Sequence, residues 1–170
     1  VGSLLGLEAM DPEKRDNKSM MTATEQLHAI FDRVRELYVQ RDRVFAYLRR
    51  KLLEKGIGHV DIHELSKKQY EELETVFQDC ILPVLSPQII DKHHPFPHLD
   101  NKKLYVSAIL KGKKKLIFGI IPLPDSVSRV VYLSKDKTEF VLLEDIIEEF
   151  VDKIFTGYPV LDKAVFAITR

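Results

Sequence analysis

Three of the six histidines in this 170-residue chain lie within six residues, in the stretch "HHPFPHLDN". A cluster of neutral imidazoles is a candidate zinc site, so His93, His94 and His98 form the first hypothesis, with Asp91 and Asp100 as possible carboxylate ligands. Adjacent histidines usually point in different directions, and no cysteine lies nearby to complete the set. The metal hypothesis is therefore the weaker of two.

The stronger hypothesis for the same stretch is structural. Pro95 and Pro97 fix the backbone of an extended path and limit any adjustment of the histidines. Phe96, between the prolines, is then expected to fill the core, and Asn101 to support a turn before the next strand. His94, Pro95, Phe96, Pro97 and Asn101 are accordingly predicted to form a structural loop.

A second histidine pair, His59 and His63, has the i, i+4 spacing that places two rings on one face of a helix. Gly56 and Gly58 precede the pair immediately, however, and "HVDIHELS" has the composition of a connector. A solvated loop is therefore favoured over a metal site here.

The stretch "KGKKK" carries Lys111, Lys113, Lys114 and Lys115 around one glycine, between two strand-like segments. Such a turn is a mobile positive patch that could attract phosphates or nucleic acid. Lysines in this position also discourage edge-to-edge strand pairing, which is their commoner use. The solvated turn is favoured, and polyanion binding remains the alternative.

Composition excludes several classes of protein. Lys plus Arg and Asp plus Glu balance at 26 each, so the net charge indicates no particular partner. Cys80 is the only cysteine, which rules out an intrachain disulfide and a cysteine-rich zinc site and favours a buried, reduced thiol in the cytoplasm. No glycine-rich phosphate loop, nucleophile elbow, signal peptide or transmembrane span is present. Residues alone indicate a globular domain with no visible active site.

The elements that position these residues are helices followed by strands. Thr22 and Glu25 form a capping-box pattern that opens a long amphipathic helix ending near Gly56, and Ser66 and Gln69 open a second helix reaching about Cys80. Arginines and acids alternate on the long helix, which indicates a salt-bridged solvent face. Strand-like runs then cover 103–110, 115–123, 129–133, 139–143 and 163–169, with helical spacing at 143–155.

This order predicts an α+β fold, in which long N-terminal helices pack on a mostly antiparallel sheet with a returning C-terminal helix. A chain of this length predicts one domain. It does not begin with Met and ends on a strand-like run, so we expect a piece of a longer protein.

Two turns in this order resemble a known family. "PVLSP", from Pro83 to Pro87, and "HPFPHLDN", from His94 to Asn101, are similar to motifs of the middle, or head, domain of bacterial polyphosphate kinase of the phosphohistidine type, as is "FVLLEDIIEEF" further on. The resemblance covers residues 24–170 as the head domain, and residues 1–23 resemble the junction from a preceding N-terminal domain. Ser86 replaces the usual threonine and His98 an apolar residue.

The resemblance implies a parent enzyme that transfers the terminal phosphate of ATP onto polyphosphate through a phosphohistidine, with ATP and Mg²⁺ as its cofactors. In this family the catalytic histidines and the magnesium ligands belong to the C-terminal domains, and the adenine contacts lie partly in the N-terminal domain. No catalytic, cofactor-binding or metal residue is therefore expected in this chain, and the isolated fragment is predicted to be inactive. None of the six histidines inherits a catalytic role.

The resemblance also implies a task for the fragment itself. The head domain assembles a homodimer or higher oligomer and helps to enclose the tunnel, so we expect an apolar patch, with Phe31, Tyr38 and Phe45 on the long helix as candidates. Polyphosphate would contact the lysine turn, and nucleic acid is not an expected partner. The parent is expected in the cytoplasm, with membrane association left open. The alternative is a stand-alone polyanion- or protein-binding α+β module.

Overall fold

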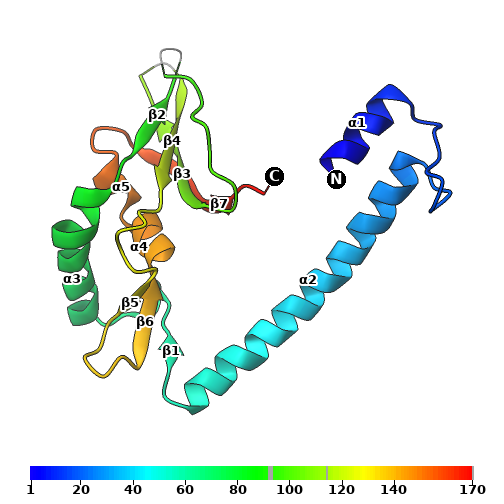
Figure 1. The fold of residues 1–170 in the computed structure, drawn as a ribbon. Helices are drawn as coiled ribbons and strands as arrows, with labels where there is room; N and C mark the ends of the chain where they lie inside the picture. The colour runs from blue at the N-terminus through cyan, green and yellow to red at the C-terminus, as the bar shows by residue number, and fades with distance from the viewer. Residues whose placement is uncertain (92–93, 114, 170) are drawn as a thin grey trace. The chain divides into compact units, whose positions relative to one another are not determined.

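A computed structural model describes residues 1–91, 94–113 and 115–169 of the chain (Figure 1). The chain divides into two compact units, Val1–Glu54 and Lys55–Arg170. The first unit is helical, and the second contains every strand of the two sheets.

The N-terminal unit consists of α1 (Gly2–Met10) and α2 (Ala23–Glu54), which pack against each other at the start of α2. α2 is 32 residues long and begins as the sequence predicts, because Thr22 and Glu25 form the expected capping box. The Glu25 amide donates to Thr22 Oγ1 at 3.2 Å, and the Thr22 amide donates to Glu25 Oε2 at 2.8 Å. Gly56 follows the helix with φ of +73°, a conformation that favours glycine.

The second unit begins with short elements and then alternates strands with helices. Its elements are β1 (Gly58–His59), η1 (Ile62–Glu64), α3 (Lys67–Val76), the π-helical η2 (Phe77–Ile81), η3 (Leu82–Val84), β2 (Gln88–Ile90), β3 (Leu104–Lys111), β4 (Leu116–Pro122), β5 (Val130–Tyr132), β6 (Glu139–Leu142), α4 (Leu143–Glu149), α5 (Val151–Ile154) and β7 (Val160–Ala167).

The larger sheet has four antiparallel strands in the order β2-β4-β3-β7. β3 lies between β4 and β7, so that Ala108 pairs with Gly119 on one side and with Lys163 on the other. A Cβ at Gly119 would lie 2.6 Å from the ring of Phe155, so only glycine lets the strand and this ring approach so closely.

A smaller sheet has the order β1-β6-β5 and contains a parallel pair. β1 pairs parallel with β6, and β5 pairs antiparallel with β6. The connector that precedes α3 is therefore held by a strand from the C-terminal part of the chain.

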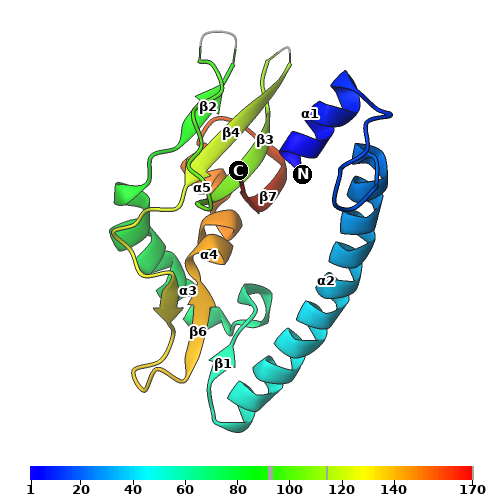
Figure 2. The same ribbon diagram turned by 45° about the vertical axis from the view of Figure 1, so that its right-hand side comes forward.

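The main core of the second unit lies between the sheets and the helices (Figure 2). Leu73 and Phe77 from the α3 region and Ile146 and Phe150 from the α4 region are buried together with inward residues of β3 and β4. A smaller cluster on the opposite face of the larger sheet contains the buried residues Leu99, Tyr105 and Ile120.

The predicted α+β class and its mostly antiparallel pairing are confirmed. The returning C-terminal helix is interrupted, because α4 ends at Glu149 and α5 begins at Val151. Cys80 is exposed on η2, so the prediction of a buried thiol is wrong. That prediction followed from the redox state expected of a lone cysteine, which does not determine the side of the π-helical turn on which the residue lies.

Candidate functional site

The proline-histidine loop is extended, as predicted, but Phe96 does not fill the core. Phe96 is 58% exposed and stacks on Phe118 with ring centroids 6.4 Å apart. Leu99 is the buried residue of the loop, and the Asp100 amide donates to the hydroxyl of buried Tyr105 at 2.8 Å. The two prolines fix the path of the backbone. They do not decide whether Phe96 or Leu99 faces the sheet, because that depends on where the strands lie.

His94, at the start of this loop, contacts Asp91 through its backbone and its ring. The Asp91 Oδ1 accepts from the His94 amide at 2.9 Å and lies 3.0 Å from His94 Nδ1. His93 lies outside the described residues. Within the ranges given above, no group of three metal-ligating side chains is present.

An open cavity of about 670 Å³ lies beside this turn. It is lined by β2, by His94 and Pro95, and by Tyr158 from the segment before β7. Sequence reasoning missed both the pairing of His94 with Asp91 and the part played by Tyr158. The pairing could have been suspected from the sequence, because Asp91 precedes His94 by three residues. No sequence signal indicated that Tyr158 would line the cavity.

The lysine turn lies at the end of β3, as the hairpin pattern predicts. The Gly112 amide donates to the Lys115 carbonyl at 3.0 Å, and the Lys111 amide donates to the Pro159 carbonyl at 2.8 Å. A Cβ on Gly112 would lie 2.7 Å from that Lys115 oxygen, so the turn depends on glycine. Lys114 lies outside the described residues.

The charge of the lysine turn is not offset by neighbouring carboxylates in the described part of the chain. Lys111, Lys113 and Lys115 are exposed and make no ion pair with any described acidic residue. By contrast, Lys67 and Lys68 on α3 lie 3.8 and 3.9 Å from glutamates one helical turn later. The turn therefore presents positive charge that a polyanion can meet.

β2, the β3–β4 turn and the start of β7 bring distant segments together. The lysine turn connects β3 to β4. β2 runs antiparallel to β4 and β7 runs antiparallel to β3, so β2 ends and β7 begins at the same end of the sheet as that turn (Figures 1 and 2). His94, Tyr158 and the lysine turn accordingly share one end of the larger sheet.

His59 and His63 do not share a helical face, because His59 lies in β1 and His63 in η1. The His59 ring stacks on Phe140 with centroids 5.3 Å apart, and its Nε2 lies 3.3 Å from Asp145 Oδ2. The prediction of a solvated loop is wrong for His59, which is half-buried against β6 and α4. Parallel pairing of β1 with β6 places it there.

Two contacts to glutamates raise the pKa of the side chains that donate to them. Arg129 donates from Nε and Nη2 to the buried carboxylate of Glu144, and this hydrogen bond raises the pKa of the Arg129 guanidinium. The Tyr70 hydroxyl donates to Glu149 Oε1 at 3.0 Å. Burial first, and this carboxylate second, raise the pKa of Tyr70 to about 12.

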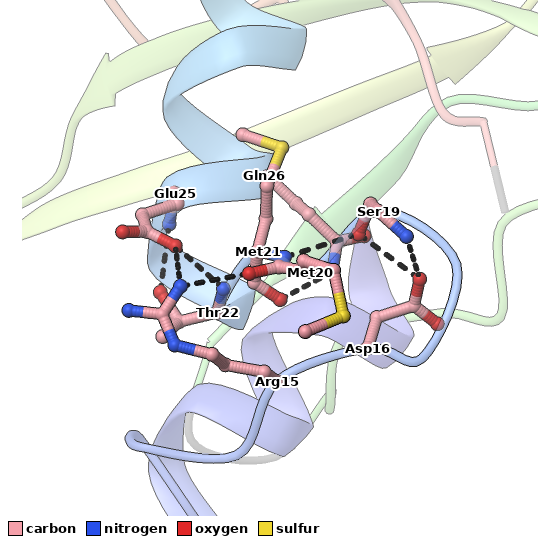
Figure 3. A network of polar contacts seen from close by, with 8 residues as sticks. All are labelled: Arg15, Asp16, Ser19, Met20, Met21, Thr22, Glu25 and Gln26. Carbon is pink, nitrogen blue, oxygen red and sulfur yellow. Dashed lines mark hydrogen bonds and ion pairs between the residues drawn. The ribbon is translucent and has the colours of Figure 1, made fainter.

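The loop between α1 and α2 is held by a polar network at the start of α2 (Figure 3). Asp16 accepts from the Ser19 amide at 2.7 Å, which holds the pKa of the Asp16 carboxyl below its usual value. Arg15 reaches both the Met20 carbonyl and Glu25, and the Thr22 amide lowers the pKa of Glu25. This network fixes the beginning of the long helix.

The rest of α2 presents polar and apolar residues to the surface. Ion pairs one turn apart, such as Arg33 with Glu36 and Arg35 with Asp32, confirm the predicted salt-bridged face. Phe31, Tyr38 and Phe45, predicted to form an interaction patch, are all exposed. No helix of the described chain has the length and apolar character of a membrane span.

Comparison with protein families matches residues 68–170 to the polyphosphate kinase middle domain. Polyphosphate kinase of Bacillus anthracis is 36% identical over 164 residues, which cover 91% of this chain and 23% of that protein. The Staphylococcus haemolyticus enzyme is 34% identical over 171 residues, with 100% of this chain and 24% of that protein covered. The chain thus spans about a quarter of these curated relatives.

The crystal structure of polyphosphate kinase from Porphyromonas gingivalis has the same fold, with a TM-score of 0.68 and 23% identity over 84% of this chain and 26% of that chain. The family match extends over more than half of the chain and includes nearly all of α3, the larger sheet, strands β5 and β6 of the smaller sheet, and the lysine turn. The chain belongs to the polyphosphate kinase family, whose middle domain it contains.

Proposed function

We propose that this chain is the middle domain of a parent enzyme that transfers the terminal phosphate of ATP to polyphosphate. The observation that carries the proposal is the family match over residues 68–170, together with relatives named polyphosphate kinase. ATP and Mg²⁺ belong to the parent's reaction, and the catalytic histidines lie in parts of the parent outside this chain. The parent acts in the cytoplasm, with or without membrane association.

The surroundings of the described histidines support a structural rather than a catalytic part for this domain. His59 packs on Phe140 beside Asp145, and His94 is held by Asp91. Each of these contacts ties a loop or connector to a neighbouring element, which is a sufficient reason for the residue to be there.

Within the parent, the domain serves assembly of a homodimer or higher oligomer and helps to enclose a tunnel. The exposed apolar face of α2 supports assembly, because Phe31, Tyr38 and Phe45 leave aromatic surface in water that a partner can bury. A globular domain rarely keeps such a row of aromatic residues on one helix without a partner.

The first test is an assay of ATP-dependent polyphosphate synthesis with the purified 170-residue chain, with an intact family member as the positive control. We expect no synthesis by the chain. Synthesis that persists after repeated purification would contradict the proposal that the catalytic residues lie elsewhere.

The second test concerns assembly. Sedimentation of the chain over a range of concentrations should show a mass that rises with concentration, and Phe45→Lys should abolish the rise. His63→Lys, a lysine placed on an exposed residue of η1, is the matched control and should leave association unchanged. A strict monomer at high concentration would count against assembly through this face.

A second candidate function is guidance of polyphosphate by the lysine turn. It is favoured by the absence of described carboxylate partners around Lys111, Lys113 and Lys115. Binding of labelled long-chain polyphosphate should weaken steeply with salt. Changing Lys113, Lys114 and Lys115 to Ala should remove up to three phosphate contacts, lowering the salt slope by about 0.7 for each.

The matched control for that triple variant is Lys67→Ala with Lys68→Ala, which removes lysines that already face glutamates. We expect this control to bind polyphosphate almost as the unchanged chain does. Equal binding by the control and the triple variant would show that the turn is a solvated cap on the hairpin.

A further inference from the structure

The two faces of the larger sheet are covered differently within the second unit. Residues of the α3 and α4 regions pack on one face, whereas the described members of the cluster on the other face come from strands, from the proline-histidine loop and from the C-terminal segment. Towards the lysine turn this second face is open, because Leu116 is 64% exposed and Ile109 and Phe118 are only half-buried. Large apolar side chains that gather on an open face are typical of a binding surface.

Phe96 and Phe118 form an aromatic stack on this open face. Their ring centroids are 6.4 Å apart and their planes are inclined by 15°. Phe118 is the half-buried ring of the stack, and Phe96, with 58% of its surface exposed, is the outer ring. The stack therefore ends in a ring that can take a further flat group in an offset arrangement.

The register of β3 and β4 places positive charge beside this stack. Ile109 of β3 pairs with Phe118 of β4, and two residues later Lys111 pairs with Leu116. Alternate residues of a strand point to the same face, so Lys111 lies on the face of the stack, about 7 Å along β3 from Ile109. The described lysines of the turn that follows make no ion pair with any described acidic residue.

We infer that this face binds single-stranded nucleic acid, with one base stacked on Phe96 and the neighbouring phosphates on Lys111 and the rest of the lysine turn. Aromatic rings beside lysines hold single strands with little regard to sequence, because every base has a flat face and every nucleotide a negative charge. The inference goes beyond the proposed function. It also departs from the expectation, drawn from the family resemblance, that nucleic acid is not a partner.

The aromatic stack distinguishes a single strand from other polyanions. Polyphosphate offers the same negative charge but no rings, so it can meet the lysine turn and gains nothing from Phe96. In a double strand the faces of the bases are stacked on one another, and reaching Phe96 would cost the energy of unstacking them. A ligand that uses both the stack and the lysines therefore has unpaired bases and a phosphate backbone.

One carboxylate lies on the same face and gives the inference a charge test. Asp162 of β7 pairs with Ile109 from the side opposite β4, and its Oδ1 accepts from the Lys163 amide at 2.9 Å. Phosphates held at Lys111 would be repelled by this carboxylate. Asp162→Asn should therefore raise the affinity for an oligonucleotide; an affinity that does not rise would place the strand elsewhere and overturn the inference.

Tryptophan fluorescence tests the stacked base directly. The chain contains no tryptophan, so Phe96→Trp places a single indole at the end of the stack. Titration with RNA and with DNA of one sequence, each about 12 nucleotides long, should quench this fluorescence, because a stacked base quenches the indole. Stronger binding of the RNA would assign a contact to the 2′-hydroxyl groups. Tyr132→Trp, on an exposed aromatic residue of the smaller sheet, is the matched control and should not be quenched.

Removal of the ring separates nucleic acid from polyphosphate. Phe96→Leu keeps an apolar side chain on the loop and should weaken oligonucleotide binding by about 5- to 150-fold, the loss of one stacked base. It should leave the binding of long-chain polyphosphate unchanged. Lys111→Ala should weaken both, since both ligands carry the charge that this lysine meets. Circular dichroism checks that each variant is folded.

The outcomes also separate this inference from the guidance of polyphosphate. Binding of polyphosphate without binding of either oligonucleotide would overturn the inference and leave that candidate function intact. No binding of any of the three ligands would overturn both. Equal oligonucleotide affinity of the unchanged chain and of Phe96→Leu, or equal quenching of Phe96→Trp by polyphosphate and by RNA, would show that no base is stacked there and would overturn the inference alone.

Discussion

The two units of this chain differ in where they keep their apolar side chains. In the second unit the core of buried residues extends from Ile62 to Phe155, whereas in α2 only Ala23 and Leu27 are buried. The helical unit exposes aromatic residues along a helix of 32 residues instead. The second unit is therefore stabilised by its own burial, whereas the first leaves the apolar surface of its long helix exposed.

The largest expected effect comes from truncating one phenylalanine in each unit. Phe150→Ala should destabilise the second unit by about 3–5 kcal/mol, because Phe150 is buried against Phe77 with ring centroids 4.7 Å apart. Phe45→Ala should change the unfolding free energy of the monomer by less than about 0.5 kcal/mol. Urea unfolding at low concentration measures both.

If Phe150→Ala and Phe45→Ala lose similar amounts of unfolding free energy, the proposed difference between the two units is wrong, since Phe45 would then be part of a core. The measurement must be made where the chain is monomeric, because loss of a dimer would otherwise be counted as loss of stability.

The next effect concerns the buried carboxylate of Glu144. Arg129→Met should cost on the order of 2–3 kcal/mol, because Glu144 is only 6% exposed and would lose its cation. The loss is smaller than for a fully buried pair because the Arg129 side chain is 61% exposed. Arg129→Met with Glu144→Gln should recover part of it in the same unfolding experiment.

If Arg129→Met alone proves neutral, the pair does not hold α4 to the segment before β5. In α2, the control substitution Arg33→Met should change stability by less than about 0.5 kcal/mol, because its ion pair with Glu36 is exposed.

Replacing glycine by alanine should lower the stability of the second unit at one position and raise that of the first unit at another. Gly119→Ala should destabilise the second unit by about 1–3 kcal/mol, because its Cβ would meet the Phe155 ring at 2.6 Å. Gly6→Ala, in the interior of α1 with nothing within 4 Å, should stabilise that helix by up to about 1 kcal/mol.

Thermal unfolding followed by circular dichroism reports both glycine variants. A neutral Gly119→Ala would mean that the Phe155 ring moves aside without cost, and the core of the second unit would be looser than its burial indicates.

The smallest expected effect is a delayed deprotonation of Tyr70 at high pH. Tyr70 has its pKa raised to about 12, from an ordinary value of 10.0, by burial and by Glu149. A raised pKa means that this contribution to stability is complete below pH 10 and is lost as the pH rises through about 12. Absorbance of tyrosinate should therefore show one late component among the six tyrosines.

Tyr70→Phe should remove that late component, whereas Tyr38→Phe, on exposed α2, is the control and should leave it in place. A late component that persists in Tyr70→Phe would assign it to another tyrosine and would place the Glu149 contact in doubt.

Local patterns predicted most of the elements. The capping boxes at Thr22 and Ser66, the glycine after α2 and the β3–β4 hairpin follow from neighbouring residues, and each is present. Their energetics depend on hydrogen bonds within a few residues, which a sequence contains in full.

Tertiary contacts were not predictable in the same way. Phe96 faces outward and stacks on Phe118, and His59 packs on Phe140, because each depends on a segment farther along the sequence. The cavity beside His94 likewise needs Tyr158, more than sixty residues later. A local pattern gives the type of an element but not the identity of its neighbours.

The pairing of β1 with β6 has a consequence for the order in which the chain folds during synthesis. Gly58 and His59 must wait for Glu139 and Phe140, and β3 must wait for β7, before either sheet is complete. Such non-local pairing is slow and leaves strand edges unpaired on the ribosome. The helical unit, made of contacts between near neighbours, can form while the rest is still being translated.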